Sequence, residues 1–274
     1  MMSTRDLNRR DFIQSGLAIL LGGPGLGAAR AQAAPLDLNV SHLSNIPYTH
    51  LDVIAERHPA AGTYIPLVVE SAERHKSTFY VDPVLFLGLI KQESDFGQHL
   101  ISPVGAGGPA QFMPSTAQDL GLRVYLPEPN YFPQARKLYG QAGRDMHEAI
   151  QLFKDGQWRK AMIRMKRGRK AKAKGKELFD RYREELEKVT RGRTDQELRG
   201  IDERFVDQIA VDKAVLHLAA LLKHRKGDVR EALSAYNAGL GRVKQFDGIP
   251  YIEETVVFQN RIVNFYKYWA PRAR

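Results

Sequence analysis

The sequence contains no cysteine among its 274 residues. That absence excludes a disulfide framework, a thiol nucleophile and any thiolate metal or iron–sulfur site. Collagen-like repeats, low-complexity stretches and a series of long apolar runs are also absent, and 43% of the residues are hydrophobic and 26% charged. This composition excludes fibrous, disordered and multi-span membrane proteins. It is typical of one large globular domain or two small ones.

Acidic residues are in deficit, because 41 Lys and Arg face 31 Asp and Glu. The excess is local. Residues 123–205 hold 22 basic and 13 acidic side chains, whereas residues 34–122 and 206–274 together are almost neutral. A charge excess confined to one segment favours an inserted element and an anionic partner or substrate.

The first 33 residues have the pattern of an export signal. Arg9 and Arg10 precede an apolar, glycine-interrupted stretch over residues 13–29, and Ala31-Gln32-Ala33 offers a small-residue cleavage site. The apolar stretch is short for a membrane span, and the paired arginines resemble a twin-arginine signal. We expect cleavage near Ala33-Ala34 and a mature protein in the periplasm. The alternative is an uncleaved amphipathic anchor, and without cysteine a lipoprotein anchor is excluded.

Helical spacing dominates the mature chain, and no convincing strand pattern appears. A helix is predicted to begin at Asp82-Pro83 and to run to about Phe96, because Asp caps free amides and Pro fits the first turn. Apolar positions recur at helical spacing in four further segments, residues 64–76, 211–223, 228–236 and 254–269. The sequence therefore predicts an all-α fold, preceded by a mostly irregular lead-in over residues 34–61.

The basic segment 123–205 is also predicted to be helical. One helix ends at a break at Gly156, a second follows it, and a third covers residues 176–190. From Arg159 to Lys176 there are ten basic residues and no acidic one. Such a run is typical of a solvated face or a mobile arm. The alternative is contact with an anionic polymer such as wall glycan peptides or phospholipid, and export makes nucleic acid an unexpected partner.

Glu93 is the leading candidate for a catalytic residue. It lies near the end of a helix whose preceding turns are almost wholly apolar, so we expect its carboxyl group to face a poorly solvated cleft. Desolvation raises the pKa of a carboxyl group, which suits a general acid near neutral pH. The structural alternative is an ordinary solvent-facing glutamate at a helix end.

Three segments resemble one enzyme family. Glu93-Ser94 is followed by Val104-Gly-Ala-Gly-Gly-Pro-Ala-Gln-Phe-Met-Pro-Ser-Thr-Ala117 and later by Ala235-Tyr-Asn-Ala-Gly-Leu-Gly-Arg-Val243. This ordered set resembles the catalytic domain of lytic transglycosylases of the soluble, goose-lysozyme-like superfamily. Val81-Asp-Pro and Ile249-Pro-Tyr-Ile-Glu-Glu-Thr are smaller matches. The resemblance implies a lysozyme-like domain over residues 62–122 and 206–274, with residues 123–205 as a basic helical insertion.

The resemblance implies cleavage of the β-1,4 bond between N-acetylmuramic acid and N-acetylglucosamine in peptidoglycan, with formation of a 1,6-anhydro sugar. Glu93 would act first as acid and then as base. The implied substrate-binding residues are Ser102, Gln111, Phe112, Met113, Tyr236 and Asn237. Of these, Met113 and Phe112 would pack beneath the cleft. The other four have structural alternatives: a turn start for Ser102, a loop brace for Gln111, a core position with a satisfied hydroxyl group for Tyr236, and a helix end for Asn237. Many relatives have Gly-Leu-Met-Gln where this chain has Gly-Pro-Ala-Gln at residues 108–111, which should alter the cleft floor.

A hydrolytic muramidase would need a second carboxylate. Asp95 lies about 200° around the helix from Glu93, and Asp119 is predicted to be a surface residue, so neither is a credible nucleophile. A muramidase and a non-catalytic peptidoglycan-binding or scaffold protein are the alternative functions.

We expect no cofactor and no metal, because the eight histidines show no ligand spacing and are typical of surface or capping positions. The expected partners are peptidoglycan glycan strands, with an anionic polymer or an exported protein as a possible further partner of residues 123–205.

Overall fold

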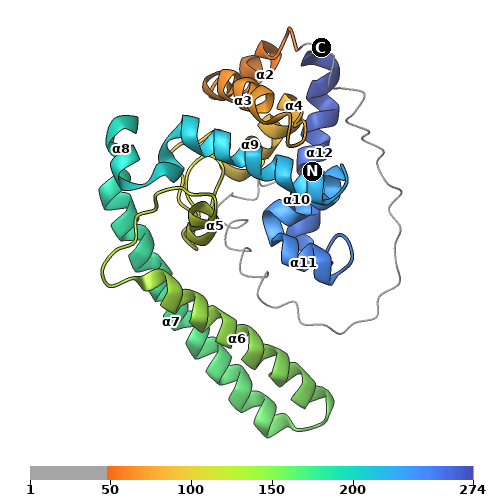
Figure 1. The fold of residues 1–274 in the computed structure, drawn as a ribbon. Helices are drawn as coiled ribbons and strands as arrows, with labels where there is room; N and C mark the ends of the chain where they lie inside the picture. Colours follow the sequence, from red (N-terminus) through yellow and green to blue (C-terminus); the bar gives the residue numbers. More distant parts are fainter. Residues whose placement is uncertain (1–47, 274) are drawn as a thin grey trace, which may run out of the picture. The chain divides into compact units, whose positions relative to one another are not determined.

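The computed structural model describes residues 48–273, and every regular element among them is a helix apart from one isolated bridge between Gly107 and Phe112. The predicted all-α class is therefore confirmed. Along the chain the helices are α2 (Asp52–Arg57), α3 (Ala61–His75), α4 (Pro83–Ser94), α5 (Pro114–Asp119), α6 (Tyr131–Lys154), α7 (Trp158–Thr190), α8 (Asp195–Ile201), the 3₁₀ helix η3 (Glu203–Phe205), α9 (Asp207–His224), α10 (Val229–Ala238), α11 (Leu240–Gln245) and α12 (Glu253–Ala273) (Figure 1).

These elements form two compact units. One contains residues 101–106 and 125–191, and the other contains the remaining described residues, 48–100, 107–124 and 192–273. The division of the chain into a transglycosylase domain and an insertion over residues 123–205 stays a prediction. The predicted signal and its cleavage site lie outside the described residues. Part of the lead-in is described, and it contains α2, whose Ile54 is fully buried.

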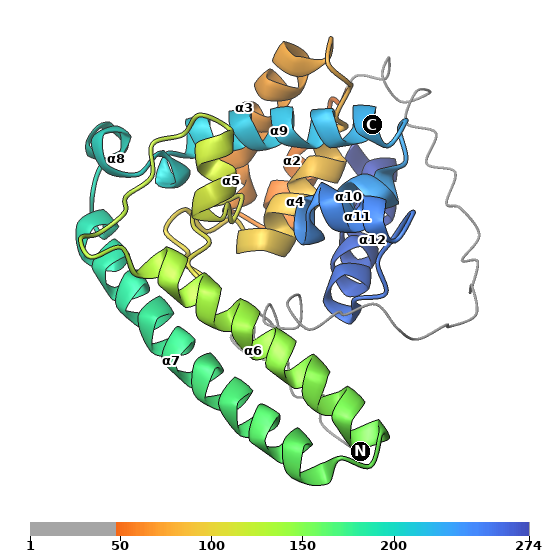
Figure 2. The same ribbon diagram turned by 60° about the horizontal axis from the view of Figure 1, so that its bottom comes forward.

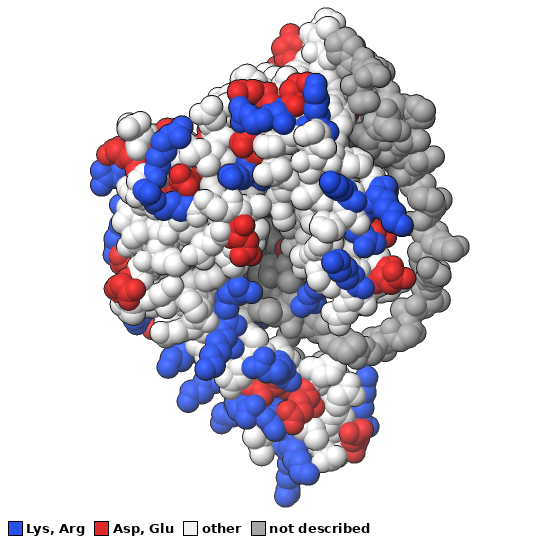
Figure 3. All heavy atoms as spheres, in the orientation of Figure 1, with Lys and Arg blue, Asp and Glu red and all other residues white. Residues whose placement is uncertain are grey.

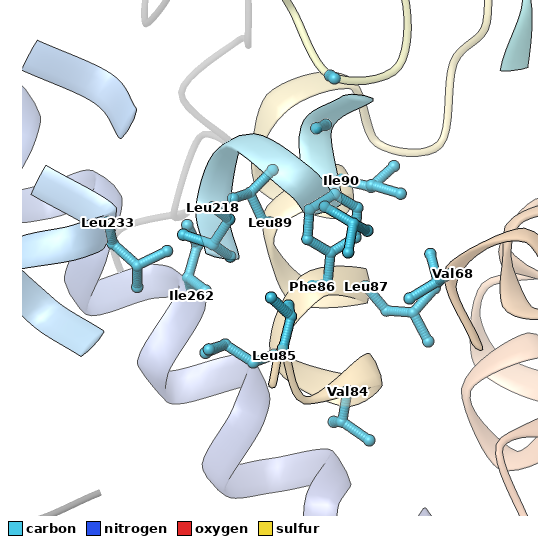
Figure 4. Close-up of a cluster of buried hydrophobic side chains, with 14 of the residues drawn as sticks. Val68, Val84, Leu85, Phe86, Leu87, Leu89, Ile90, Leu218, Leu233 and Ile262 are labelled. Carbon is cyan, nitrogen blue, oxygen red and sulfur yellow. The ribbon is translucent and has the colours of Figure 1, made fainter. Parts of the chain in front are cut away.

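Helix α4 is the centre of the second unit. The carboxylate of Asp82 accepts hydrogen bonds from the backbone amides of Val84 and Leu85, at 2.9 and 3.3 Å, so the predicted start at Asp82-Pro83 is confirmed. Every residue from Pro83 to Ile90 is buried. Figure 4 shows these side chains surrounded by apolar residues of α3, α9, α10 and α12.

The packing of α4 against α12 depends on Gly88. A Cβ atom at this position would lie 3.4 Å from the Cβ of Phe265 and 3.5 Å from the carbonyl oxygen of Ile262. The absence of a side chain therefore allows the two helices to approach closely. Helix α4 ends after Ser94, where Asp95 takes a left-handed conformation with φ 53°. Glu93 thus lies on the last turn of a helix whose preceding residues are packed in the hydrophobic core.

The first unit is built on an antiparallel pair of long helices, α6 and α7 (Figure 2). Phe132 and Tyr139 of α6 pack against Phe179 and Tyr182 of α7, with ring centroids 5.1 to 5.9 Å apart. The predicted break at Gly156 is confirmed, because α6 ends at Lys154 and α7 begins at Trp158.

The predicted second and third helices of this segment are instead one continuous helix, α7. Small residues explain how its basic stretch packs. Ala161, Gly168, Ala171 and Gly175 are buried on one face, which lets the Lys and Arg side chains between them point to solvent. None of the described helices combines the length and the apolar character needed to cross a bilayer.

Candidate active site

Glu93 is half-buried on α4, and its surroundings strongly disfavour the charged form. Burial, and to a lesser extent the nearby charge of Glu254, raise the pKa of the Glu93 carboxyl group to about 8. At neutral pH the group therefore holds its proton. A carboxylic acid that stays protonated at this pH can act as a general acid.

Glu254 is the second carboxyl group of the site. It lies in the first turn of α12, and burial raises its pKa to about 7. Its Oε2 atom is buried and has no hydrogen-bond partner among residues 48–273. Because the pKa of Glu254 is the lower of the two, it ionises first, and its charge then opposes the ionisation of Glu93.

Glu254 is thus a carboxyl group near Glu93 that the sequence patterns do not indicate, and the prediction that neither Asp95 nor Asp119 is a nucleophile stays a prediction. Asp95 is exposed and pairs with Lys91 at 2.8 Å, and Asp119 is exposed, as predicted. No sequence pattern marks Glu254 as a titratable group of the site, although the segment from Ile249 to Thr255 that contains it is part of the family resemblance. Only the contact between α4 and α12 brings this glutamate to Glu93.

Tyr236 approaches the same site from α10. Its hydroxyl group donates a hydrogen bond to the carbonyl oxygen of Ala110 at 3.1 Å. Burial raises the pKa of Tyr236 well above its usual value, and the charge of Glu93 adds to that rise. The phenol therefore keeps its proton and connects the helix to the loop that precedes α5.

Asn237, the next residue, contacts α12. Thr255 Oγ1 donates a hydrogen bond to Asn237 Oδ1 at 2.8 Å, and Thr255 is fully buried. This bond holds the C-terminal end of α10 to the start of α12, one residue from Glu254. Asn237 therefore has a positioning role, and its predicted contact with substrate stays a prediction.

Gln111 braces the loop that contains it. Its Nε2 atom donates hydrogen bonds to the carbonyl oxygens of Leu100 and Gly108, at 2.9 and 2.8 Å. The residue has a positive φ of 48°, which a non-glycine residue adopts only when surrounding contacts hold it. These contacts match the structural alternative, and its predicted binding of sugar stays a prediction.

The glycines of this loop allow close contact with η3. A Cβ at residue 107 would lie 2.6 Å from the ring of Phe205, and one at residue 108 would lie 1.7 Å from the carbonyl oxygen of Arg204. Both glycines are therefore required by packing.

The Arg204 side chain holds the loop from the same side. It is fully buried, pairs with Asp202 at 2.7 Å, and donates through its Nη1 atom to the carbonyl oxygen of Phe112 at 3.2 Å. Sequence patterns had given Arg204 no role. Its position immediately after an Asp-Glu pair resembles an ordinary surface charge, and only its burial distinguishes it.

Comparison with known families agrees with this geometry. Residues 70–137 match the family model described as the transglycosylase SLT domain. These 68 residues are similar to a transglycosylase SLT domain. A search of curated proteins and a search of solved structures gave no match to the chain. SLT domains have the lysozyme-like all-α fold and belong to lytic transglycosylases, so peptidoglycan is the substrate class that the family implies.

The matched segment includes Glu93 and the loop up to α5. Tyr236, Asn237 and Glu254 lie beyond it, on helices that complete the same compact unit as α4. The candidate site thus combines residues of the matched segment with residues more than a hundred positions later.

Phe112 packs beside Tyr236, and the predicted position of Phe112 and Met113 beneath the cleft stays a prediction. Phe112 is buried, and its ring lies 6.2 Å from that of Tyr236 and 6.3 Å from that of His217. Met113 is half-buried at the start of α5.

His217 differs from the surface or capping role expected of the histidines. Burial lowers the pKa of His217, which favours the neutral imidazole. The centroid of its ring lies 5.4 Å from that of Tyr236. Among residues 48–273 no group of three His, Asp or Glu side chains is arranged to hold a metal ion.

Ser102 belongs to the unit that contains α6 and α7. It is buried, and its Oγ atom accepts a hydrogen bond from the backbone amide of Ala106 at 2.9 Å. This bond closes the turn around Gly105, where a Cβ atom would lie 2.6 Å from the ring of Tyr182. The contacts match the structural alternative for Ser102, and its predicted role in binding sugar stays a prediction.

Proposed function

We propose that this SLT domain cleaves the β-1,4 bond between N-acetylmuramic acid and N-acetylglucosamine without consuming water. The observation that carries the proposal is the position of Glu93 on the last turn of the buried helix α4 near Glu254, where burial and the charge of Glu254 raise its pKa to about 8. A glutamate that is protonated at neutral pH can give its proton to the glycosidic oxygen, which then leaves with the N-acetylglucosamine end.

The second step returns the proton. As the bond between C1 and the glycosidic oxygen breaks, positive charge develops at C1 of the muramic residue. The C6 hydroxyl oxygen of the same residue forms a new bond to C1 and loses its proton to the Glu93 carboxylate. The product is a 1,6-anhydro sugar, and the enzyme is restored with Glu93 protonated.

Glu254 has two effects in this scheme. When it is ionised, its negative charge keeps the pKa of Glu93 high, and it favours the positive charge that develops on the sugar. Its buried Oε2 atom, which has no hydrogen-bond partner among the described residues, is able to accept a bond from a substrate hydroxyl or amide group. Tyr236 connects α10 to the loop at Ala110, and Asn237 connects α10 to the start of α12.

Hydrolysis is the second candidate, and the presence of Glu254 is the observation that favours it. Glycosidases that use water have two carboxyl groups beside the scissile bond, one as acid and one as nucleophile or base. Mass spectrometry of the sugars released from isolated cell walls separates the two functions. The anhydro product is lighter than the hydrolytic product by one water.

A Glu93→Gln variant is the matched control in that experiment. It keeps the size and hydrogen-bonding capacity of the side chain and removes the proton that is transferred. We expect anhydro sugars from the natural chain and almost none from the variant. Hydrolytic sugars would favour a muramidase, and wall binding without any release would favour a non-catalytic protein.

We also propose that the protein is exported to the periplasm, where peptidoglycan lies. The support is the paired Arg9 and Arg10 before the apolar stretch. A chain with both arginines replaced by lysine should stay in the cytoplasmic fraction at its full length. Unchanged export of that variant would contradict a twin-arginine route.

A further inference from the structure

Five of the large apolar side chains that are exposed on the described part of the chain gather at one place. They lie on the last turns of α6 and the first turns of α7, on either side of the loop formed by residues 155–157. Their exposed fractions range from 50 to 68%, and the residues are Ile150, Phe153, Trp158, Met162 and Ile163. We call this set the hairpin tip. An exposed apolar cluster of this kind marks a site that contacts another molecule or a membrane.

The hairpin tip is ordered by its own contacts. Phe153 and Trp158 face each other across the loop, with ring centroids 4.5 Å apart in an edge-to-face arrangement. Along the helix axes the five residues lie within about 8 Å of the loop, at a rise of about 1.5 Å per residue. Their extent matches the depth of about 5–10 Å to which amphipathic elements enter the interface of a bilayer.

Basic side chains follow directly behind the tip on α7. Arg164 and Arg167 form ion pairs within the hairpin, because both contact the buried carboxylate of Asp145. Seven other cations make no ion pair with any residue from 48 to 273, namely Arg159, Lys160, Lys166, Arg169, Lys170, Lys172 and Lys174. All seven are exposed, and Figure 3 shows Lys and Arg gathered over the hairpin.

Helical geometry places apolar and basic groups on the same outward side. Met162 and Lys166 are one turn apart, and Arg169 and Lys170 follow on the next turn, opposite the buried face formed by Gly168 and Ala171. This arrangement suits a lipid interface, because aromatic side chains lie at the end of the hairpin and basic side chains lie on the adjoining turns of the helix. The aliphatic side chains at the tip would gain little from a hydroxyl-rich glycan, whereas they gain free energy by entering a layer of acyl chains.

We propose that the hairpin tip inserts into the surface of an anionic phospholipid bilayer, with the basic side chains of α7 contacting the headgroups. This binding is separate from the proposed chemistry at Glu93. It would hold the enzyme at a membrane that borders its substrate.

The test uses the full chain and two vesicle preparations, pure phosphatidylcholine and phosphatidylcholine with about one third phosphatidylglycerol. The chain has two tryptophans. Trp269 is buried, with an exposed fraction of 2%, so a change in fluorescence emission on binding reports Trp158. We expect the emission to shift to shorter wavelength with anionic vesicles only. We also expect affinity at least about tenfold higher for anionic vesicles, decreasing at high salt.

Paired variants separate this site from the rest of the chain, including the apolar residues 13–29. Lys166→Glu/Lys170→Glu should weaken vesicle binding about tenfold or more. The control Lys223→Glu/Lys267→Glu, which makes the same charge change at exposed positions of the other unit, should not. Met162→Ser/Ile163→Ser should weaken it to a similar extent, and Val69→Ser, an exposed aliphatic position on α3, should not.

None of these variants should change the release of sugars from isolated walls, so failure of this proposal is distinct from failure of the catalytic one. The proposal is overturned if Trp158 emission does not shift, or if the tip and control variants bind vesicles equally. It is also overturned if the tip variants change only self-association of the protein or only its retention on lipid-free walls. Those outcomes would point to a second copy of the chain or to the glycan as the occupant of the tip.

Discussion

The charge of Glu254 on α12 opposes the ionisation of Glu93 on α4, and this repulsion adds to the effect of burial on the pKa of Glu93. The two residues come from opposite ends of the domain, and the packing of α4 against α12 at Gly88 brings their helices together. A half-buried pair of acids with pKa values near 8 and 7 can hold one proton and one charge at neutral pH. That state suits an acid catalyst next to a developing cation.

Replacement of Glu254 by Gln should move the alkaline limb of the activity profile to lower pH. The repulsive charge is removed, so Glu93 loses its proton more readily and the acid form is lost earlier as pH rises. The rate of sugar release from walls, measured between pH 5 and pH 9, gives the profile. Glu253→Gln, at the exposed neighbouring position, is the control and should leave the limb in place. An unchanged limb in the Glu254 variant would show that the two carboxyl groups do not interact.

Glu93→Gln should make the protein more stable while abolishing activity. The folded pKa of Glu93 is about 8 and lies above the value for an exposed glutamate, so the folded state binds more protons than the unfolded state between these values. The stability of the natural chain therefore decreases as pH rises through this window. A neutral Gln avoids the loss, and its advantage should be larger at pH 8 than at pH 5 by about 2–3 kcal/mol.

Urea unfolding of both chains at pH 5 and pH 8 measures that difference directly. Equal effects of the substitution at the two pH values would contradict a raised pKa at Glu93.

Gly108→Ala should destabilise the domain by about 3 kcal/mol or more, because its Cβ would lie 1.7 Å from the carbonyl oxygen of Arg204. Gly121→Ala is a matched control. Gly121 has nearly the same φ, 78° against 75°, but no atom lies within 4 Å of its Cβ position. The control should therefore lose only about 1 kcal/mol from backbone strain. If the two variants unfold at the same temperature, close packing against η3 is not the reason for the glycine.

Tyr236→Phe should reduce stability by about 1–2 kcal/mol and slow sugar release more than tenfold. The substitution removes the hydrogen bond to Ala110 and leaves that carbonyl group without its partner. Because Tyr236 positions the loop beside Glu93, we expect kcat to decrease more than KM increases. Tyr268→Phe, at an exposed position on α12, is the control. Unchanged kcat in the Tyr236 variant would contradict its positioning role.

The sequence predicts the parts of this fold that depend on local chemistry. Asp82 and Pro83 define the start of α4 because capping and proline geometry act within one turn, and Gly156 marks the hairpin loop for the same reason. The sequence does not predict the continuity of α7. The basic stretch of this helix lacks a stripe of large apolar residues. It is helical because its small residues pack against α6.

Parts of the site could not be predicted because they depend on contacts between segments that are far apart in the sequence. Glu254 is one glutamate among many until the contact between α4 and α12 places it near Glu93. Arg204 is distinguished only by complete burial with Asp202, and the bond between Asn237 and Thr255 joins two helix ends that are separate in the sequence. Motif spacing indicates which residues matter, whereas their partners depend on tertiary packing.

In the proposed reaction Glu93 gives one proton and takes it back, and no water enters the product. Digestion of isolated walls in water enriched in ¹⁸O follows the fate of that water. We expect anhydro sugars that contain no ¹⁸O, with release lost in Glu93→Gln. Released muramic ends that carry ¹⁸O would instead identify hydrolysis assisted by a second carboxylate.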